Sequence, residues 1–334
     1  MLPGGHPTPR GGHPEPSTTT TRPEAGPVVG RTPPSGRQHR ITWRDHEAVV
    51  TQVGAGLREC VLDGRPVVDG FDVDERAPDG RGQVLAPFPN RLAGGRYTFG
   101  GRTCQVAVDE PERGNAIHGM VRWLDWTEVS WTEHDVVLGC VLRPQPGYAW
   151  ELTLQLGYHL SAEGLTVASS VRNTGVEPAP FGMGFHPYLG LGVPVDALEL
   201  LVPAQTHFPV PADRDERPTP VDVTGSHLDF RTPRAVGPEI LDTVFGELAR
   251  GDDGRAVVHL ADPVGGQGVR LWVDDAFGYL MVYTADGVEP AERRRRSVAI
   301  EPMTCPPHAL RSGADLVTLE PGATWRGTWG LATG

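Results

Sequence analysis

Glu301 and His186 are the side chains of this sequence best suited to moving protons. Glu301 ends an apolar run at residues 298–300 and precedes a proline-rich turn. A carboxylate beside buried residues holds protons more tightly, which suits a general base. His186 lies in the segment FGMGFHPYL, where glycines allow the backbone to approach a ligand closely. Because an imidazole titrates near neutral pH, His186 can donate or accept a proton.

Two more segments carry polar side chains that could bind a ligand. Residues 86–91 (APFPNR) form a proline-rich turn that presents the amide of Asn90 beside the guanidinium of Arg91. A guanidinium is a rigid fork of donors for a hydroxyl group or an oxyanion. His118 has apolar and glycine neighbours, so we expect it to lie against packed backbone. Taken singly, Arg91 also fits a surface arginine in a turn, and His118 a buried structural histidine.

Together the segments resemble the active-site blocks of the aldose 1-epimerase (galactose mutarotase) family, in the same order and at similar separations. The motifs are Pro-Asn-Arg, Arg-Gly-Asn-Ala-Ile-His-Gly, His-Pro-Tyr and Glu-Pro-Met-Thr, and the similarity extends from about Thr42 to Trp329. The resemblance implies that Glu301 is the general base for the anomeric hydroxyl of a hexose. It implies that His186 is the general acid for the ring oxygen. The residues that it implies at the sugar hydroxyls are Asn90, Arg91, His118 and Asp242.

Asp242 belongs to the segment LDTVF, which resembles the family's substrate-binding aspartate motif, although it also fits a charge on a helix surface. The sequence departs from the best-studied galactose enzymes at Met120, where a second glycine is expected, and at Pro187. These departures resemble a bacterial branch with poorly defined hexose substrates, one member of which is thought to act on a sulfonated hexose. Arg122 is our candidate for a cation near C6 of such a sugar.

The chemistry implied here needs no metal, nucleotide or other cofactor. Opening a hemiacetal removes a proton at O1 and delivers one at O5. A carboxylate and an imidazole on opposite sides of the ring can do both, each contributing about 10²–10⁴-fold. Two other classes stay open. A glycoside hydrolase would use two carboxylates about 5–9 Å apart. A non-catalytic sugar-binding or regulatory protein would keep Arg91 and Asp242 without needing both Glu301 and His186.

Strand signals dominate the chain and predict an all-β fold, and the resemblance implies the family's large antiparallel β-sandwich. Apolar residues alternate from Leu152 to Leu160, a turn follows, and the alternation resumes at Leu165, which is typical of a hairpin. Residues 269–273 alternate in the same way. Only residues 237–248 have apolar side chains at helical spacing, and we predict a helix there.

The sequence predicts a disordered tail at residues 1–36 and a single domain at residues 37–334. The tail holds nine prolines and seven glycines and no aromatic residue, so it cannot bury enough apolar surface to offset its ordering entropy. A net charge of −12 argues against a nucleic-acid partner. No apolar run approaches the roughly 18 residues that span a bilayer. We therefore expect a cytoplasmic protein, a monomer or homodimer, and the resemblance implies a sugar as its partner.

The cysteines and the arginine run have simple structural interpretations. Cys60, Cys104, Cys140 and Cys305 are widely spaced, without a C-x-x-C pair, and we predict buried thiols in a reducing compartment. No residues have the clustered spacing of zinc ligands, so no metal site is predicted. Arg293–Arg296 lie between apolar strands and are predicted to form a solvated loop.

Overall fold

The computed structural model describes residues 1, 4, 32–209 and 218–334. The packed unit begins at Pro33. Ser35 is buried, and its carbonyl accepts a hydrogen bond of 3.0 Å from the backbone N–H of Val53. Residues 33–36, which we assigned to the tail, therefore belong to the packed unit. Residues 2–3 and 5–31 of the predicted tail lie outside the described residues.

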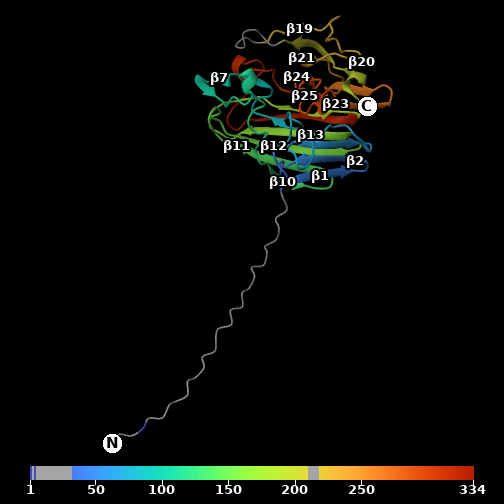
Figure 1. The fold of residues 1–334 in the computed structure, drawn as a ribbon. Coiled ribbons are helices and arrows are strands. Elements are labelled where there is room, and N and C mark those ends of the chain that lie inside the picture. The colour runs from blue at the N-terminus through green and yellow to red at the C-terminus, as the bar shows by residue number, and fades with distance from the viewer. Residues whose placement is uncertain (2–3, 5–31, 210–217) are drawn as a thin grey trace. The chain divides into compact units, whose positions relative to one another are not determined.

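The packed unit is built from antiparallel sheets, and in Figure 1 strands β21, β24 and β25 lie above β11, β12 and β13. One long sheet contains, in spatial order, β10 (Thr127–Trp131), β11 (Asp135–Leu142), β12 (Leu152–Ser161), β13 (Gly164–Asn173), β27 (Thr324–Thr333), β23 (Gln267–Val273), β22 (Ala256–Asp262), β17 (Glu199–Leu201) and β20 (Arg234–Ala235). Another contains β19 (Val221–Asp222), β18 (Ala204–Phe208), β21 (Asp242–Leu248), β24 (Tyr279–Tyr283), β25 (Val298–Met303), β15 (Gly184–Phe185) and β5 (Val84–Leu85), with β16 (Tyr188–Leu189) also paired to β25.

Shorter sheets complete the architecture. The N-terminal one contains β1 (Gln38–Trp43), β2 (His46–Thr51), β3 (Leu57–Leu62) and β4 (Arg65–Pro66). The short pairs are β6 (Arg91–Ala93) with β9 (Asn115–Ile117), β7 (Arg96–Phe99) with β8 (Arg102–Gln105), and β14 (Ala179–Phe181) with β26 (Val317–Leu319). Helix within the described residues is limited to α1 (Ala309–Ser312) and 3₁₀ turns at Pro111–Arg113, Val195–Ala197 and Ala291–Arg293. None of these described helices is long and apolar enough to cross a membrane.

The predicted hairpin and the all-β fold class are confirmed. Strands β12 and β13 pair antiparallel, with Leu160 opposite Leu165. The alternating apolar side chains of β12 are at most 1% exposed, whereas Gln155 and His159 between them are exposed. Because successive side chains of a strand point to opposite faces, one face of this sheet covers the core.

The helix predicted over residues 237–248 is wrong. Residues 242–248 form β21, between β18 and β24, and Ile240, expected on the apolar side of the helix, is 70% exposed. Val244 and Phe245 are neighbours and both are buried, because both faces of β21 are covered. Such a strand lacks the alternation of a half-buried strand, and over a few residues its apolar pattern resembles that of a helix.

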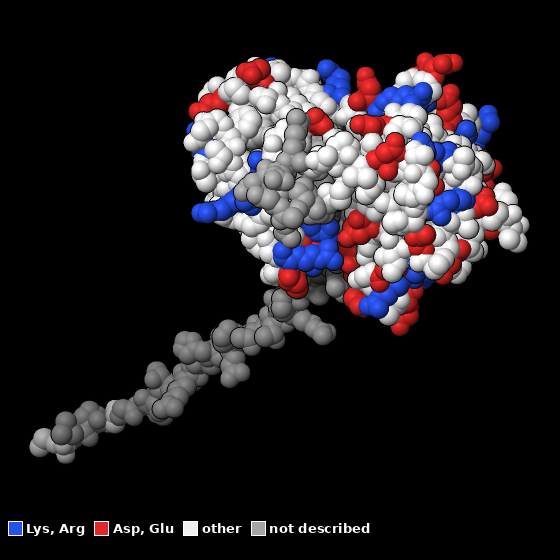
Figure 2. Space-filling view, turned by 90° about the horizontal axis from the view of Figure 1, so that it is seen from above, with Lys and Arg blue, Asp and Glu red and all other residues white. Residues whose placement is uncertain are grey.

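The predictions for the cysteines and for the arginine run need correction in part. Cys60, Cys104 and Cys305 are buried, but Cys140 is only half-buried. The arginine run is not simply solvated, because its side chains form ion pairs. Arg293 pairs with Glu75 at 2.7 Å, and Arg295 pairs with Asp196 at 2.6 Å and Asp286 at 2.7 Å. On the face in Figure 2, basic and acidic side chains are likewise interspersed over the described surface.

Left-handed turns hold His118 beside residues 86–91. Asn90 has φ 55° and His118 has φ 63°, and the backbone N–H of His118 donates to the Asn90 carbonyl at 2.9 Å. Gly119, with φ 72°, lies so close to Ala86 that a Cβ atom there would be 2.1 Å from the Ala86 carbonyl oxygen. Glycine at position 119 is therefore required for the contact that places His118.

Gly119→Ala should destabilise the protein far more than Gly94→Ala. Both glycines have positive φ, but a Cβ atom at Gly94 would meet no atom within 4 Å. We expect a loss of about 1 kcal/mol at Gly94 from backbone strain alone, and of about 3 kcal/mol at Gly119 because the clash adds to the strain. Equal losses in denaturant unfolding would show that the contact between Gly119 and Ala86 does not constrain the fold.

Candidate active site

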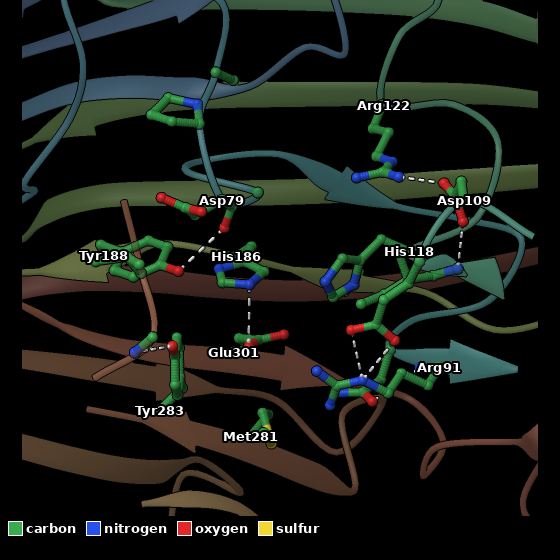
Figure 3. Close-up of a pocket in the computed structure, with 18 of the residues that line it drawn as sticks. Asp79, Arg91, Asp109, His118, Arg122, His186, Tyr188, Met281, Tyr283 and Glu301 are labelled. Atoms are coloured by element: carbon green, nitrogen blue, oxygen red, sulfur yellow. Dashed lines mark hydrogen bonds and ion pairs between the residues drawn. The ribbon is translucent and has the colours of Figure 1, made fainter. Parts of the chain in front are cut away.

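The register of β21, β24 and β25 builds one wall of a cavity of about 640 Å³ (Figure 3). Asp242 pairs with Tyr283, and Met281 pairs with Glu301. Tyr283 and Met281 are two residues apart on β24, so these four side chains point to the same face of the sheet. All four line the cavity. Because β25 continues to Met303, the prediction that Glu301 ends its strand is wrong.

Strand pairing also brings His186 against Glu301. Strands β15 and β16 flank His186, and both pair with β25, Gly184 with Met303 and Tyr188 with Ala299. Nε2 of His186 lies 3.3 Å from Oε1 of Glu301, and the two side chains are 6% and 3% exposed. The two side chains that we expected on opposite sides of a sugar ring are thus in direct contact in this structure.

The glycines before His186 make room for protein, not for a ligand as we predicted. A Cβ atom at Gly182 would lie 2.5 Å from Sγ of Cys305, and one at Gly184 would lie 2.9 Å from Cβ of Pro89. Bare backbone at these positions lets the His186 segment pack directly on its neighbours. The glycines therefore act on the site indirectly, because they fix the position of the backbone that carries His186.

Burial opposes a charge on either member of the His186–Glu301 pair. It raises the pKa of Glu301 well above its usual value; the charge of Asp242 adds to this effect and that of Arg91 opposes it. It lowers the pKa of His186 to about 3. Oε2 of Glu301 and Nδ1 of His186 are buried and have no hydrogen-bond partner among the described residues. Burial therefore favours the uncharged form of each group, a carboxylic acid and a neutral imidazole.

His118 completes a group of buried rings at the back of the cavity. Its imidazole meets that of His186 edge to face, with ring centroids 5.2 Å apart. Burial and the neighbouring His186 lower the pKa of His118 well below its usual value, which favours the neutral imidazole. Its Nδ1 is buried and has no hydrogen-bond partner in the described part of the chain.

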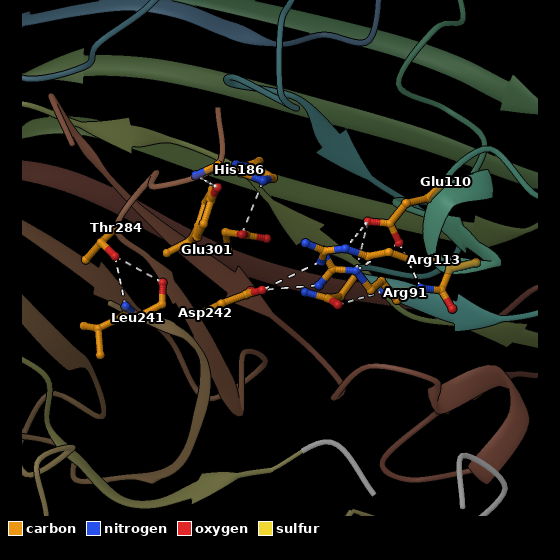
Figure 4. Close-up of polar contacts among 12 residues, drawn as sticks. Arg91, Glu110, Arg113, His186, Leu241, Asp242, Thr284 and Glu301 are labelled. Atoms are coloured by element: carbon orange, nitrogen blue, oxygen red, sulfur yellow. Dashed lines mark hydrogen bonds and ion pairs between the residues drawn. The ribbon is translucent and has the colours of Figure 1, made fainter. Parts of the chain in front are cut away.

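Arg91 and Asp242 belong to one ion-pair network (Figure 4). Nε of Arg91 donates to both carboxylate oxygens of Glu110, at 3.0 and 3.2 Å. Nη1 of Arg91 and Nη1 of Arg113 each lie 3.9 Å from a carboxylate oxygen of Asp242. Asn90 also lines the cavity, and its Oδ1 accepts a hydrogen bond of 2.8 Å from the backbone N–H of Arg91. The network fixes a cation and a carboxylate beside Glu301.

The sequence-predicted site residues Glu301, His186, Arg91, His118, Asp242, Asn90 and Arg122 all line this cavity. Arg122 forms an ion pair with Asp109 (Figure 3), so its charge is already partly compensated. Sequence reasoning missed Asp109 and Glu110, the carboxylates that hold the two arginines. Glu110 lies just before the Arg-Gly-Asn-Ala-Ile-His-Gly motif, but only the folded structure shows that it faces Arg91. Among the described residues, no three histidine, cysteine or acidic side chains are grouped as a metal site requires.

Comparisons with known proteins extend over almost all of the packed unit. The sequence model of the aldose 1-epimerase family matches residues 39–331. The uncharacterized protein YihR of Escherichia coli K12 is 32% identical over 295 residues, which cover 87% of this chain and 92% of that protein. An aldose 1-epimerase of the same organism is 26% identical over 226 residues, 61% of this chain and 60% of its own.

Solved structures show the same fold. A putative aldose 1-epimerase of E. coli K12 superposes with a TM-score of 0.75 at 21% identity, and covers 89% of this chain and 99% of its own. The GalM/aldose epimerase homologue of C. elegans superposes with a TM-score of 0.77 at 18% identity, and covers 89% and 98%. The antiparallel sandwich is therefore that of the galactose mutarotase-like structures.

Glu301→Gln should stabilise the protein, and more so at pH 8 than at pH 5. A carboxyl group whose pKa is raised on folding binds its proton more tightly in the folded state, so it costs stability as pH rises above the unfolded pKa of about 4.3. The neutral amide avoids this cost. We expect the stability gain to grow by more than about 1 kcal/mol between the two pH values, measured by denaturant unfolding. The same substitution at the exposed Glu320 is the control. A gain independent of pH would contradict the raised pKa.

Proposed function

Because the chain belongs to the aldose 1-epimerase family, we propose that it is a mutarotase, an isomerase that interconverts the α and β anomers of a hexose. The contact of 3.3 Å between His186 and Glu301 at the cavity wall carries this proposal. Glu301 is the proposed general base and His186 the proposed general acid. The proposed contacts of the sugar hydroxyls are Asn90, Arg91, His118 and Asp242.

Ring opening needs two proton transfers at atoms that are both bonded to C1. The Glu301 carboxylate removes the proton of the O1 hydroxyl, the O1 electrons form the C1=O1 double bond, and the C1–O5 bond breaks. The His186 imidazolium gives its proton to O5. After rotation about the C1–C2 bond, the reverse transfers close the ring on the other face of C1. Adjacent acid and base groups suit this reaction, because O1 and O5 share one carbon atom.

The pair holds one proton before the reaction and one after it. Ring opening converts the ionised pair, carboxylate and imidazolium, into the uncharged pair that burial favours. The proton transfers therefore proceed in the direction that the desolvated site supports. The free-energy cost lies in an earlier step, the formation of the ionised pair in the buried site. The positive charge of Arg91 favours the Glu301 carboxylate and opposes the His186 imidazolium, so it acts on the two members of the pair in opposite directions.

The contact between a carboxyl group and an imidazole supports this function over the other candidates. A glycoside hydrolase needs two carboxyl groups that flank the scissile bond, whereas the group in contact with Glu301 here is His186. A binding protein gains nothing from burying an ionisable pair whose outer atoms are unpartnered, since buried unpaired polar groups are costly. Proton transfer gives a reason for retaining both groups.

Glu301→Gln and His186→Gln should each lower kcat by at least about 100-fold with little change in KM, because each removes one proton carrier. Polarimetry of freshly dissolved α-glucose, α-galactose and a 6-substituted hexose is the measurement, with Glu320→Gln as the control. Since both transfers belong to one event, the double variant should be little slower than either single variant. A Glu301→Gln protein that turns over at the wild-type rate would show that another group, Asp242 first, is the base.

The choice of sugar is proposed to depend on hydroxyl contacts and on the arginines of the cavity. Arg122 lines the cavity and its guanidinium is 5.4 Å from the ring centroid of Trp123. If Arg122 reads a charged group at C6, Arg122→Ala should lower kcat/KM for a 6-charged hexose by about 10-fold relative to a neutral one. Asp109→Asn frees the guanidinium and should act in the opposite direction. Unchanged relative values in both variants would remove Arg122 from this role.

A further inference from the structure

Arg81 is an arginine buried beneath the candidate site. It is 1% exposed, and its Nη1 donates to the backbone carbonyl and the carboxylate of Asp69, both at 2.8 Å. Its Nε and Nη2 are buried and have no hydrogen-bond partner among the described residues. Asp69 is shared, because it also accepts a hydrogen bond of 2.7 Å from Ser297. The charge of Arg81 is therefore paired with one carboxylate, but two of its nitrogens lack acceptors in the described chain, at a depth where that is costly.

A ring connects this charge to His186. The Arg81 guanidinium lies 4.1 Å from the ring centroid of Tyr188. The same ring stacks on the imidazole of His186, with centroids 5.0 Å apart and planes inclined by 17°. The Tyr188 hydroxyl donates to the carbonyl of Asp79 at 3.1 Å (Figure 3). Tyr188 is thus held by its hydroxyl and by Arg81, and it presents a fixed surface to the imidazole.

The imidazole of His186 is held by stacking and packing, whereas many functional histidines are held by a hydrogen bond to the second ring nitrogen. A carboxylate or carbonyl commonly binds the second ring nitrogen of a functional histidine, but Nδ1 of His186 has no such partner in the described chain. Gly80 packs so tightly that a Cβ atom there would lie 2.9 Å from Cδ2 of His186. The plane of the ring therefore depends on Tyr188, on Gly80 and on the edge of His118.

We propose that Arg81 and Tyr188 are positioning residues for His186: Tyr188 fixes the plane of the imidazole, and Arg81 holds the Tyr188 ring and places a positive charge behind it. The role of His186 as a general acid, which Arg81 and Tyr188 would support, rests on the proposed function. A purely structural role would be served as well by an apolar side chain, which avoids the cost of a partly paired buried cation. The charge has a use only if something nearby responds to it.

Several charged or titratable groups face His186, and Arg81 acts among them. Three arginines oppose a positive charge on the imidazole, and the effect of Arg81 is larger than that of Arg122 or Arg91. Glu301 is the contacting group that favours the imidazolium. The titratable and charged groups around the imidazole are Arg81, Arg91, Arg122, His118, Tyr188 and Glu301.

The test is the ionisation of His186 itself, followed by NMR of the full-length protein carrying labelled histidine rings. The sample is titrated from pH 8 to the lowest pH at which the fold persists, and His186→Gln assigns the signal. Removing the charge in Arg81→Met should raise the pH at which His186 becomes charged by about one unit. Arg81→Lys keeps the charge, so His186 should become charged within a few tenths of a pH unit of the wild-type value. These readouts need no substrate, so they hold whether or not the protein is a mutarotase.

Kinetics test the positioning role separately. Tyr188→Phe keeps the stacked ring and should retain most of kcat, whereas Tyr188→Leu should lose about 10-fold in kcat with little change in KM. The proposal is overturned if His186 in Arg81→Met titrates as in the wild type, or if Arg81→Lys and Arg81→Met move it equally. If Arg81→Met does not fold, the two Tyr188 variants test the proposal instead. Equal kcat values for Tyr188→Phe and Tyr188→Leu would overturn the proposal.

Discussion

Burial of a carboxyl group in direct contact with an imidazole is the constraint on which this structure depends. Glu301 and His186 are both nearly inaccessible, and neither has a hydrogen-bond partner at its outer atom among the described residues. In such a place charge is expensive, so burial favours the uncharged form of both groups over an ion pair. For the proton transfers that we propose, the ionised pair forms at a cost that ring opening then recovers.

The strands around the Glu301–His186 pair fix the positions of both residues and of the side chains next to them. Strand β25 provides Glu301 and pairs on both sides of His186 through β15 and β16. Strand β24 places Met281 beside Glu301 and Tyr283 beside Asp242. The β6–β9 pair brings Arg91 opposite Ile117, next to His118. Charged residues that would disturb the pair are tied to one another, Arg91 to Glu110 and Arg122 to Asp109. Arg81 is likewise tied to Asp69, but it also packs against the Tyr188 ring that stacks on His186.

Much of the site could be predicted from the sequence, because its residues lie in short segments of unusual composition. Glu301, His186, Arg91 and His118 were found in this way, and the hairpin at residues 152–173 followed from alternation. What failed depends on long-range pairing. The strand at Asp242 looked helical because both of its faces are buried, and the contact of Glu301 with His186 is a matter of register across β25. Arg81 gave no signal, since a buried arginine and an exposed one read alike in a sequence.

The protonation of Glu301 at neutral pH is the central claim, and infrared difference spectroscopy tests it most directly. The spectrum of Glu301→Gln is subtracted from that of the wild type in the absence of sugar, with Glu320→Gln treated in the same way. The account predicts the carbonyl stretch of a protonated carboxylic acid at neutral pH, present in the wild type and in Glu320→Gln and lost in Glu301→Gln. A difference spectrum that contains only carboxylate bands would mean that Glu301 is ionised at rest, and would contradict the account.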